Sequence, residues 1–219
     1  MYHTARGAHL PPRDQRATLK LVLRLTQNRK SSNGKSMSQA SRLVTKYSYR
    51  EYECFPNDGF RHEIVDGVHF MSPAPSTKHQ KVSRKIHFQL YSQIEQKSLG
   101  EVYNAPTDVE LSEHDIVQPD IIVVLREQLD IITSKKIHGI PALVVEILSE
   151  SNRRYDQVLK FEMYQKSGVF EYWIVDTVAE MVQQFVLVND RYADAGTHHK
   201  IIAPKYINGV EIDLLEAWI

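Results

Sequence analysis

The chain has 219 residues, of which 42% are hydrophobic and 25% charged, as is typical of a globular protein that buries a core. No apolar run approaches the roughly 18 residues of a membrane-spanning helix. The single cysteine, Cys54, excludes a disulfide framework and a cysteine zinc site. We therefore expect a cytoplasmic protein of a reducing compartment, without a membrane partner.

The formal net charge of zero conceals two parts of opposite charge. Residues 1–36 carry a net charge of +7 and end in a polar, Ser- and Gly-rich stretch, whereas the remaining residues carry −7. This composition predicts a basic, disordered extension and linker over residues 1–46 and a folded domain over residues 47–219. A basic arm that touches nucleic acid and a targeting peptide are the alternatives for the N-terminal segment.

Regular patterns begin near Tyr47. The stretch FRHEIVDGVHFMSP predicts two short strands around an Asp-Gly turn. Ser76 is a suitable helix cap, and apolar residues at a spacing of four then predict an amphipathic helix over residues 77–98. The pattern next predicts strands in EVYNAPTDVEL, IVQPDIIVVL and ALVVEIL, a helix over residues 153–167, a strand in EYWIVD, and a hairpin that turns at Asn189-Asp190.

This order of elements predicts a mixed α/β fold, in which a central β-sheet is flanked by helices and a C-terminal hairpin follows. The phosphate-binding patterns GxxxxGK[ST] and GxGxxG are absent from the sequence, and so is the hydrolase pattern GxSxG.

Two carboxylates interrupt apolar strands. Asp120 directly follows Pro119, which favours a place at the start of a strand, and Glu146 lies near the end of the strand ALVVEIL. Burying an unpaired carboxylate is costly. Two acids at the ends of neighbouring strands can instead hold one hard cation, because Mg²⁺ is usually bound by one or two carboxylates.

Lys160 lies on the helix that follows the strand of Glu146, and Tyr164 shares its helix face at a spacing of four. From that position Lys160 could lean over the carboxylates, orient an attacking water and neutralise charge that develops on a phosphoryl group. The alternative is a purely structural ion pair between Glu146 and Lys160 or Arg153.

Several of these stretches together resemble a known family. HEIVDGVHFMSPAPSTKHQ, GEVYNAPTDVEL, VQPDIIVV and the long block that begins at GIPALVVEIL resemble the Uma-type family of restriction endonucleases, a branch of the PD-(D/E)xK nuclease superfamily. The resemblance runs from about Tyr47 to the C-terminus. It implies a restriction-endonuclease-like fold in which Asp120 and Glu146 are the metal-binding acids. Leu148 stands where the superfamily has its lysine, and the family resembled places that lysine on the following helix, at Lys160.

The resemblance also bears on two further residues. Glu63, in HEIVDG, matches an acid of the family, which implies an additional metal ligand or a residue that holds water. The alternative is a solvated strand residue. His79 also matches the family, but as a lone histidine it is interpreted as a structural residue that forms hydrogen bonds.

Two functions from different classes remain open. The first is a Mg²⁺- or Mn²⁺-dependent DNA endonuclease with Asp120, Glu146 and Lys160 as catalytic residues. The second is a catalytically inactive module of the same fold that binds nucleic acid or a protein partner. The charge of −7 over residues 37–219 opposes DNA binding, which depends on phosphate neutralisation. A homodimer, the basic arm, or the cluster of Lys78, Lys81, Arg84 and Lys85 could offset it, although such a cluster is also typical of a solvated helix face.

Overall fold

Groups of strands are separated by single helices along the described chain. The computed structural model describes residues 45–149 and 155–219. The helices are α2 (Tyr49–Tyr52), α3 (Thr77–Leu90), a π-helical turn η1 (Tyr91–Glu95), a 3-10 helix η2 (Arg126–Ile131), α4 (Tyr155–Ser167) and α5 (Leu214–Trp218). The strands are β1 (Arg61–Val65), β2 (Val68–Ser72), β3 (Gly100–Asn104), β4 (Val109–Ser112), β5 (Asp115–Val117), β6 (Ile121–Leu125), β7 (Ile137–His138), β8 (Leu143–Ile147), β9 (Glu171–Asp176), β10 (Met181–Val188), β11 (Arg191–His198), β12 (Ile201–Ile202) and β13 (Ile212–Asp213).

The described residues belong to one compact unit. The basic segment before it and Arg153, one of the two predicted partners of Glu146, lie outside the described residues. The division of the chain at residue 46 therefore stays a prediction.

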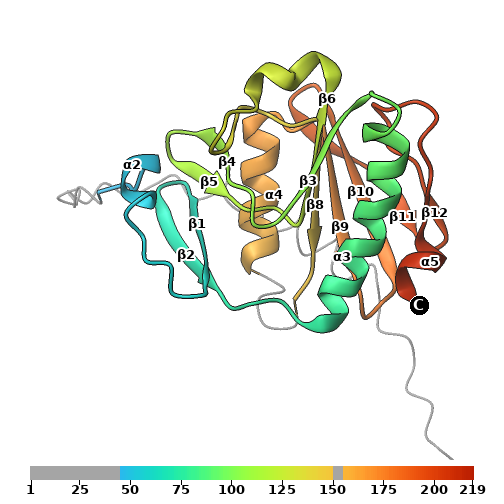
Figure 1. Ribbon diagram of the computed structural model, residues 1–219, viewed down its shortest axis with the longest axis horizontal. Helices are drawn as coiled ribbons and strands as arrows, with labels where there is room; N and C mark the ends of the chain where they lie inside the picture. Colours follow the sequence, from blue (N-terminus) through green and yellow to red (C-terminus); the bar gives the residue numbers. More distant parts are fainter. Residues whose placement is uncertain (1–44, 150–154) are drawn as a thin grey trace, which may run out of the picture. The chain divides into compact units, whose positions relative to one another are not determined.

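Most of the strands form two mixed sheets. A six-stranded sheet has the order β11-β10-β9-β8-β6-β3, and a five-stranded sheet has the order β2-β1-β5-β4-β7. In the first sheet β8 runs parallel to β9 and antiparallel to β6. Strands β12 and β13 form a further small pair. The expected mixed α/β fold with flanking helices is confirmed, and the strands of its central layer are divided between two sheets (Figure 1).

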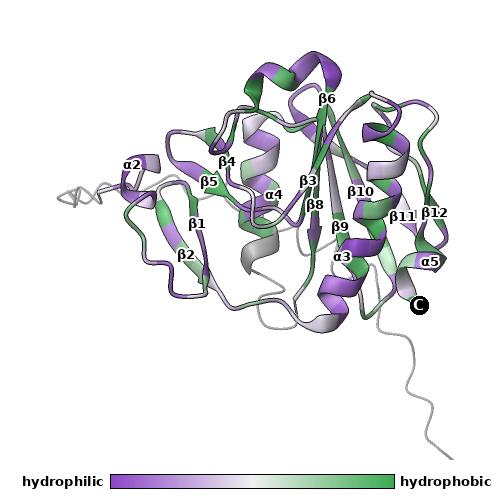
Figure 2. Ribbon diagram, viewed as in Figure 1, coloured by the Kyte–Doolittle hydropathy of each residue, from purple (hydrophilic) through white to green (hydrophobic). Residues whose placement is uncertain are grey.

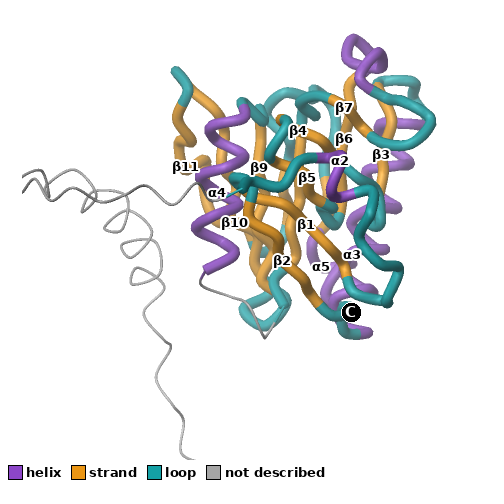
Figure 3. The backbone as a smooth tube through the Cα atoms, turned by 90° about the vertical axis from the view of Figure 1, so that its left-hand side faces the viewer, coloured by secondary structure: helices purple, strands orange, loops and turns teal. Residues whose placement is uncertain are grey.

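Helices cover both faces of the six-stranded sheet. Apolar side chains of α3 and α5 pack in one core with alternate residues of β6, β8 and β9, such as Val123, Val145 and Trp173. On the other face Tyr164 of α4 packs against Tyr172 of β9. Figure 3 shows α4 on one side of the strands and α3 with α5 on the other. Since successive strand residues point to opposite faces, Glu146 faces α4 rather than the α3 core.

The hydropathy pattern explains this layering. Strands β6 and β8 are apolar along nearly their whole length because both of their faces are covered (Figure 2). In α3 the buried residues Val82, Ile86 and Leu90 recur at a spacing of four and form the stripe that faces the sheet. No helix among the described residues is long and apolar enough to cross a membrane.

Several predicted elements are confirmed and others are wrong. Hairpins occur at both expected turns, and Asp66, Asn189 and Asp190 adopt the positive φ values that tight hairpins require. The single strand expected in EVYNAPTDVEL is wrong, because it divides into β3 and β4, which lie in different sheets. Pro106, which has no N–H to donate to a sheet, lies between them.

Two other boundaries differ from the expectation. IVQPDIIVVL divides at Pro119 into β5 and β6, again in different sheets. The helix expected over residues 77–98 ends as α3 at Leu90 and continues as η1. The elements β12, β13 and α5 were not anticipated, because the first two are short and α5 has five residues.

Candidate active site

Asp120 and Glu146 lie opposite each other on neighbouring antiparallel strands. The pairing of β6 with β8 aligns Ile121 with Val145, and one further step brings Asp120 opposite Glu146. Residues in such positions project to the same face of a sheet. Asp120 stands immediately before β6, as predicted, and its Oδ2 accepts a hydrogen bond of 2.8 Å from the backbone N–H of Ile147. Both carboxylates are buried.

Strand β1 of the other sheet supplies Arg61 and Glu63. Because strand residues alternate between faces, Arg61, Glu63 and Val65 share the face that lines the site, whereas His62 points away and contacts His69. The loop between β5 and β6 fixes both functional side chains. The N–H of Gln118 donates to Glu63 Oε1 at 2.9 Å, and its carbonyl accepts from Arg61 at 3.1 Å.

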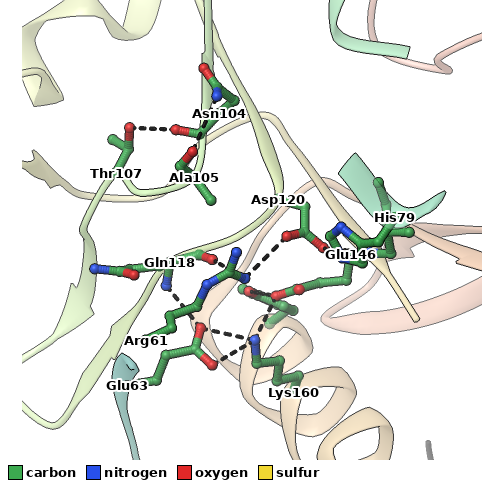
Figure 4. Close-up of polar contacts among 12 residues, drawn as sticks. Arg61, Glu63, His79, Asn104, Ala105, Thr107, Gln118, Asp120, Glu146 and Lys160 are labelled. Carbon is green, nitrogen blue, oxygen red and sulfur yellow. Dashed lines mark hydrogen bonds and ion pairs between the residues drawn. The ribbon is translucent and has the colours of Figure 1, made fainter. Parts of the chain in front are cut away.

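Lys160 of α4 lies between two carboxylates. Its Nζ is 2.9 Å from Glu146 Oε1 and 2.9 Å from Glu63 Oε1, and Figure 4 shows the ammonium between the two acids. Tyr164, one helical turn further on, donates a hydrogen bond of 2.7 Å to Glu146 Oε1. The shared helix face predicted for Lys160 and Tyr164 therefore meets Glu146.

Asp120 has its own set of partners. Its Oδ1 is 3.1 Å from the guanidinium of Arg61, and its Oδ2 is 3.0 Å from Nε2 of His79 at the start of α3. The Nδ1 atom of His79 is buried and has no hydrogen-bond partner among the described residues. Elements α3, β1 and β6 therefore converge on one carboxylate (Figure 4).

These side chains line a cavity of about 510 Å³. Arg61, Glu63, Asp120, Glu146 and Lys160 all contribute to its wall, and the first residues of α3 complete one side. The cavity is large enough for a substrate group, since ligand sites typically measure about 300–1,000 Å³. The buried charged side chains on its otherwise largely apolar wall distinguish it from a purely apolar ligand pocket.

The electrostatics of Lys160 and Glu146 are coupled. Burial lowers the pKa of Lys160, but the attraction of Glu146 and Glu63 outweighs it and raises the pKa above its usual value. The ammonium is therefore permanently charged near neutral pH. Burial raises the pKa of Glu146, and repulsion from Asp120 and Glu63 adds to this effect, although Lys160 partly offsets it. The site thus carries more negative charge than one lysine can neutralise.

Asp120 shows the opposite behaviour. Burial alone would raise its pKa, but the hydrogen bond from His79 and the charge of Arg61 lower the pKa below its usual range. Asp120 is therefore ionised at neutral pH.

The donor set fits a hard divalent cation that is bound in part by water or substrate. Asp120 and Glu146 supply two carboxylates on one face, and Mg²⁺ is commonly held by one or two carboxylates plus water and phosphate oxygens. The repulsion that raises the pKa of Glu146 is the kind of cost that a cation relieves. Across residues 45–149 and 155–219, however, no three His, Cys, Asp or Glu side chains are arranged to hold a metal ion. The described side chains alone therefore do not form a complete metal cage.

The sequence-based candidates come together, with one addition. Asp120, Glu146, Lys160 and Glu63 all lie at the same cavity. Glu63 holds Lys160, and its predicted role as a metal ligand stays a prediction. Arg61 was missed, although its position two residues before Glu63 on a strand was a usable signal. His79 forms the hydrogen bond expected of a structural histidine, and its partner is Asp120.

Comparisons with known proteins bear on the family and the fold of the chain. Residues 49–214 match the model of the Uma2 family, described as "Putative restriction endonuclease". The crystal structure of "a putative nuclease belonging to DUF820 from Anabaena variabilis" superposes with a TM-score of 0.66 at 14% identity. That match covers 78% of this chain and 97% of the other, and at this identity it establishes the fold alone. No curated protein matches the chain.

Proposed function

Because the chain belongs to the Uma2 family of restriction-endonuclease-like proteins, we propose that it is a DNA endonuclease that hydrolyses phosphodiester bonds with the help of Mg²⁺ or Mn²⁺. The observation that carries the proposal is the position of Lys160, whose ammonium contacts Glu146 and Glu63 next to Asp120. Two carboxylates can hold a cation and a lysine can stabilise phosphate charge, so these groups at one cavity can support metal-assisted phosphate hydrolysis.

Asp120 and Glu146 would hold the cation, which when bound would lower the pKa of a water and offset charge on the phosphate. Without a bound cation, Glu146 and Glu63 raise the pKa of Lys160 and keep its ammonium protonated, which favours an electrostatic role over that of a general base. Its ammonium instead stabilises negative charge that develops on the phosphate oxygens, and it holds Glu146 and Glu63 in place. Arg61 and His79 orient Asp120 in the same way.

Incubating the full chain with supercoiled plasmid tests the proposal. We expect nicking or cutting with Mg²⁺ or Mn²⁺, none with EDTA, and none with Glu146→Gln under either condition. The matched control is Glu127→Gln, which removes an exposed carboxylate from η2 and should cleave like the wild type. Cleavage in EDTA, or by Glu146→Gln, would contradict the assigned roles, and no cleavage with any divalent cation would contradict the activity.

A catalytically inactive module that binds nucleic acid or a protein partner is the second candidate. The net charge of −7 over residues 37–219 favours a protein partner over DNA in that case. The candidate predicts that the plasmid stays intact even though the chain folds. The cytoplasmic location and a homodimer stay predictions.

A further inference from the structure

The outer face of α3 carries a row of unpaired positive charge. Thr77–Leu90 contains four Lys or Arg residues and no Asp or Glu, in a domain whose overall charge is negative. Lys78, Lys81 and Arg84 are exposed, and Lys85 is half-buried. None of these four side chains forms an ion pair with another described residue, whereas Lys46, Lys135 and Lys136 each do. Nothing in the described fold therefore neutralises this face.

The row lies on one side of the helix. Val82, Ile86 and Leu90 form the buried stripe, and at 100° per residue Lys81 and Arg84 fall on the opposite half of the helix. Lys78 lies one turn before Val82, at the edge of that stripe nearest the cavity. The row also begins at the candidate active site, because Lys78 lines the cavity and the neighbouring His79 contacts Asp120. Figure 2 shows strongly hydrophilic residues along α3.

An aromatic side chain stands at the far end of the row. Phe88 is 65% exposed, and at a spacing of four from Arg84 and seven from Lys81 it lies on the same helix face. Burying a phenylalanine typically gains about 1.5–3 kcal/mol, so a largely exposed ring next to cations gains stability when something stacks on it. A positive groove with interleaved aromatic residues is the pattern by which proteins bind single-stranded nucleic acid.

We propose that the outer face of α3 binds a single-stranded segment of nucleic acid and leads it into the cavity at Asp120. The cations contact its phosphates, and Phe88 stacks on an unpaired base. The distance from Lys78 to Phe88 along the helix is about 15 Å at 1.5 Å per residue, which is long enough for a short segment of several nucleotides. The proposal rests on the proposed nuclease function for the identity of the polymer.

Binding can be measured without cleavage. A fluorescein-labelled oligothymidine and a labelled DNA duplex are titrated with the full chain in EDTA, and fluorescence anisotropy is recorded between about 50 and 200 mM salt. Lys81→Ala/Arg84→Ala should weaken oligothymidine binding and flatten the salt dependence by about 1.4 in log–log slope, since each phosphate contact on single strands contributes about 0.7. The matched control, Arg191→Ala/Lys205→Ala, removes two exposed positive charges elsewhere and should leave the slope unchanged.

Variants of Phe88 distinguish the contribution of base stacking from that of charge. Phe88→Ala should weaken oligothymidine binding at least about 5-fold with the salt slope intact, because base stacking contributes about 1–3 kcal/mol. Phe88→Tyr should bind oligothymidine as the wild type does. Neither variant should change the affinity for the duplex.

Three outcomes would overturn the proposal: an equal loss in the control pair, no effect of Phe88→Ala, or binding to phosphatidylserine vesicles in place of oligothymidine. If the molecular mass in solution rises with protein concentration and Phe88→Ala abolishes that rise, the face binds a second copy of the chain. This result would also overturn the proposal. A chain that binds oligothymidine through α3 but never cleaves would refute the nuclease activity and support this surface.

Discussion

The Nζ atom of Lys160 lies 2.9 Å from Glu63 Oε1, although 97 positions separate the two residues in the chain. The same ammonium contacts Glu146, which belongs to the other sheet. The single ammonium group of Lys160 therefore forms ion pairs with a residue of β1 and a residue of β8. The three residues are almost completely buried, so neither carboxylate can compensate with bulk water if the lysine is lost.

Lys160→Ala should retain most of its Mn²⁺ binding, measured by calorimetry, but lose about 10²–10³ in cleavage rate, as expected when one electrostatic contact to a transition state is removed. The variant should also lose about 3–5 kcal/mol of stability in the absence of metal, because it leaves buried carboxylates unpaired. Added metal should restore part of that loss. Lys166→Ala, at an exposed position on the same helix, is the control.

Lys160→Arg distinguishes position from charge. Arginine keeps the charge but has a larger, planar head group. We expect it to retain more stability than alanine while cleaving poorly. If both variants cleave at the wild-type rate, Lys160 takes no part in the mechanism.

Glu146→Gln should change how stability depends on pH. The pKa of Glu146 is raised in the folded state, so between its unfolded and folded values the folded protein holds more protons than the unfolded protein. Stability contributed by this group is therefore present below the unfolded pKa and is lost as pH rises through the folded pKa. As pH increases from about 4.3 towards neutrality, the thermal midpoint of Glu146→Gln should rise relative to that of the wild type.

Thermal melts of both proteins across this range, with Glu127→Gln as the exposed control, measure the effect. A constant difference between Glu146→Gln and the wild type at every pH would show that the carboxyl titrates alike in both states, contrary to the geometry. Metal must be chelated throughout, because a bound cation would itself lower the pKa.

Glu171 tests a buried carboxylate that lies outside the site. Its oxygens accept hydrogen bonds from Trp173 Nε1 at 2.6 Å, Gln184 Nε2 at 2.6 Å and the backbone N–H of Lys205 at 2.7 Å. Glu171→Ala leaves three donors without this acceptor, and one unsatisfied buried donor costs about 1–3 kcal/mol. We expect a loss of at least about 2 kcal/mol in urea unfolding, whereas Glu216→Ala on the exposed surface of α5 should change little. The cleavage rate of the folded fraction should stay near the wild-type value.

Removal of residues 1–36 tests the predicted division of the chain. The family match begins at residue 49, and the deleted segment carries the +7 charge. A chain that begins at Met37 should melt within about 2 °C of the full protein, because a shift of 2–4 °C corresponds to about 1 kcal/mol at this size. A drop of many degrees, or aggregation, would show that the segment contributes to the fold.

The hydrophobic pattern accounts for much of the fold. The spacing of Val82, Ile86 and Leu90 marked a helix with one buried face, and the Asp-Gly and Asn-Asp pairs marked hairpins. The partition into two sheets was not accessible in this way. It depends on which strands pair at a distance, and the local pattern around Pro106 and Pro119 is compatible with both a bend and a change of sheet.

The site was predictable to a similar extent. Acids inside apolar strands are anomalous enough to identify Asp120 and Glu146, and helical spacing from Tyr164 supports Lys160. Arg61 begins an ordinary alternating strand, so its role depends on the pairing of β1 with β5, which brings it to Gln118 and Asp120. The spacing of two from Glu63 places Arg61 on the same strand face, but local sequence does not encode the register that brings this face to Asp120.

Because the site takes side chains from both sheets, its geometry depends on how the two sheets are aligned. Arg61 and Glu63 are attached to the five-stranded sheet, whereas Asp120 and Glu146 are attached to the six-stranded one. A slip of about 1 Å between the sheets would break contacts of 2.9–3.1 Å, and misplacement on that scale can cost about 100-fold in rate. A molecule that binds away from the cavity and shifts β1 relative to β6 would therefore inhibit without competing for substrate, and mild denaturant would abolish activity before either sheet melts.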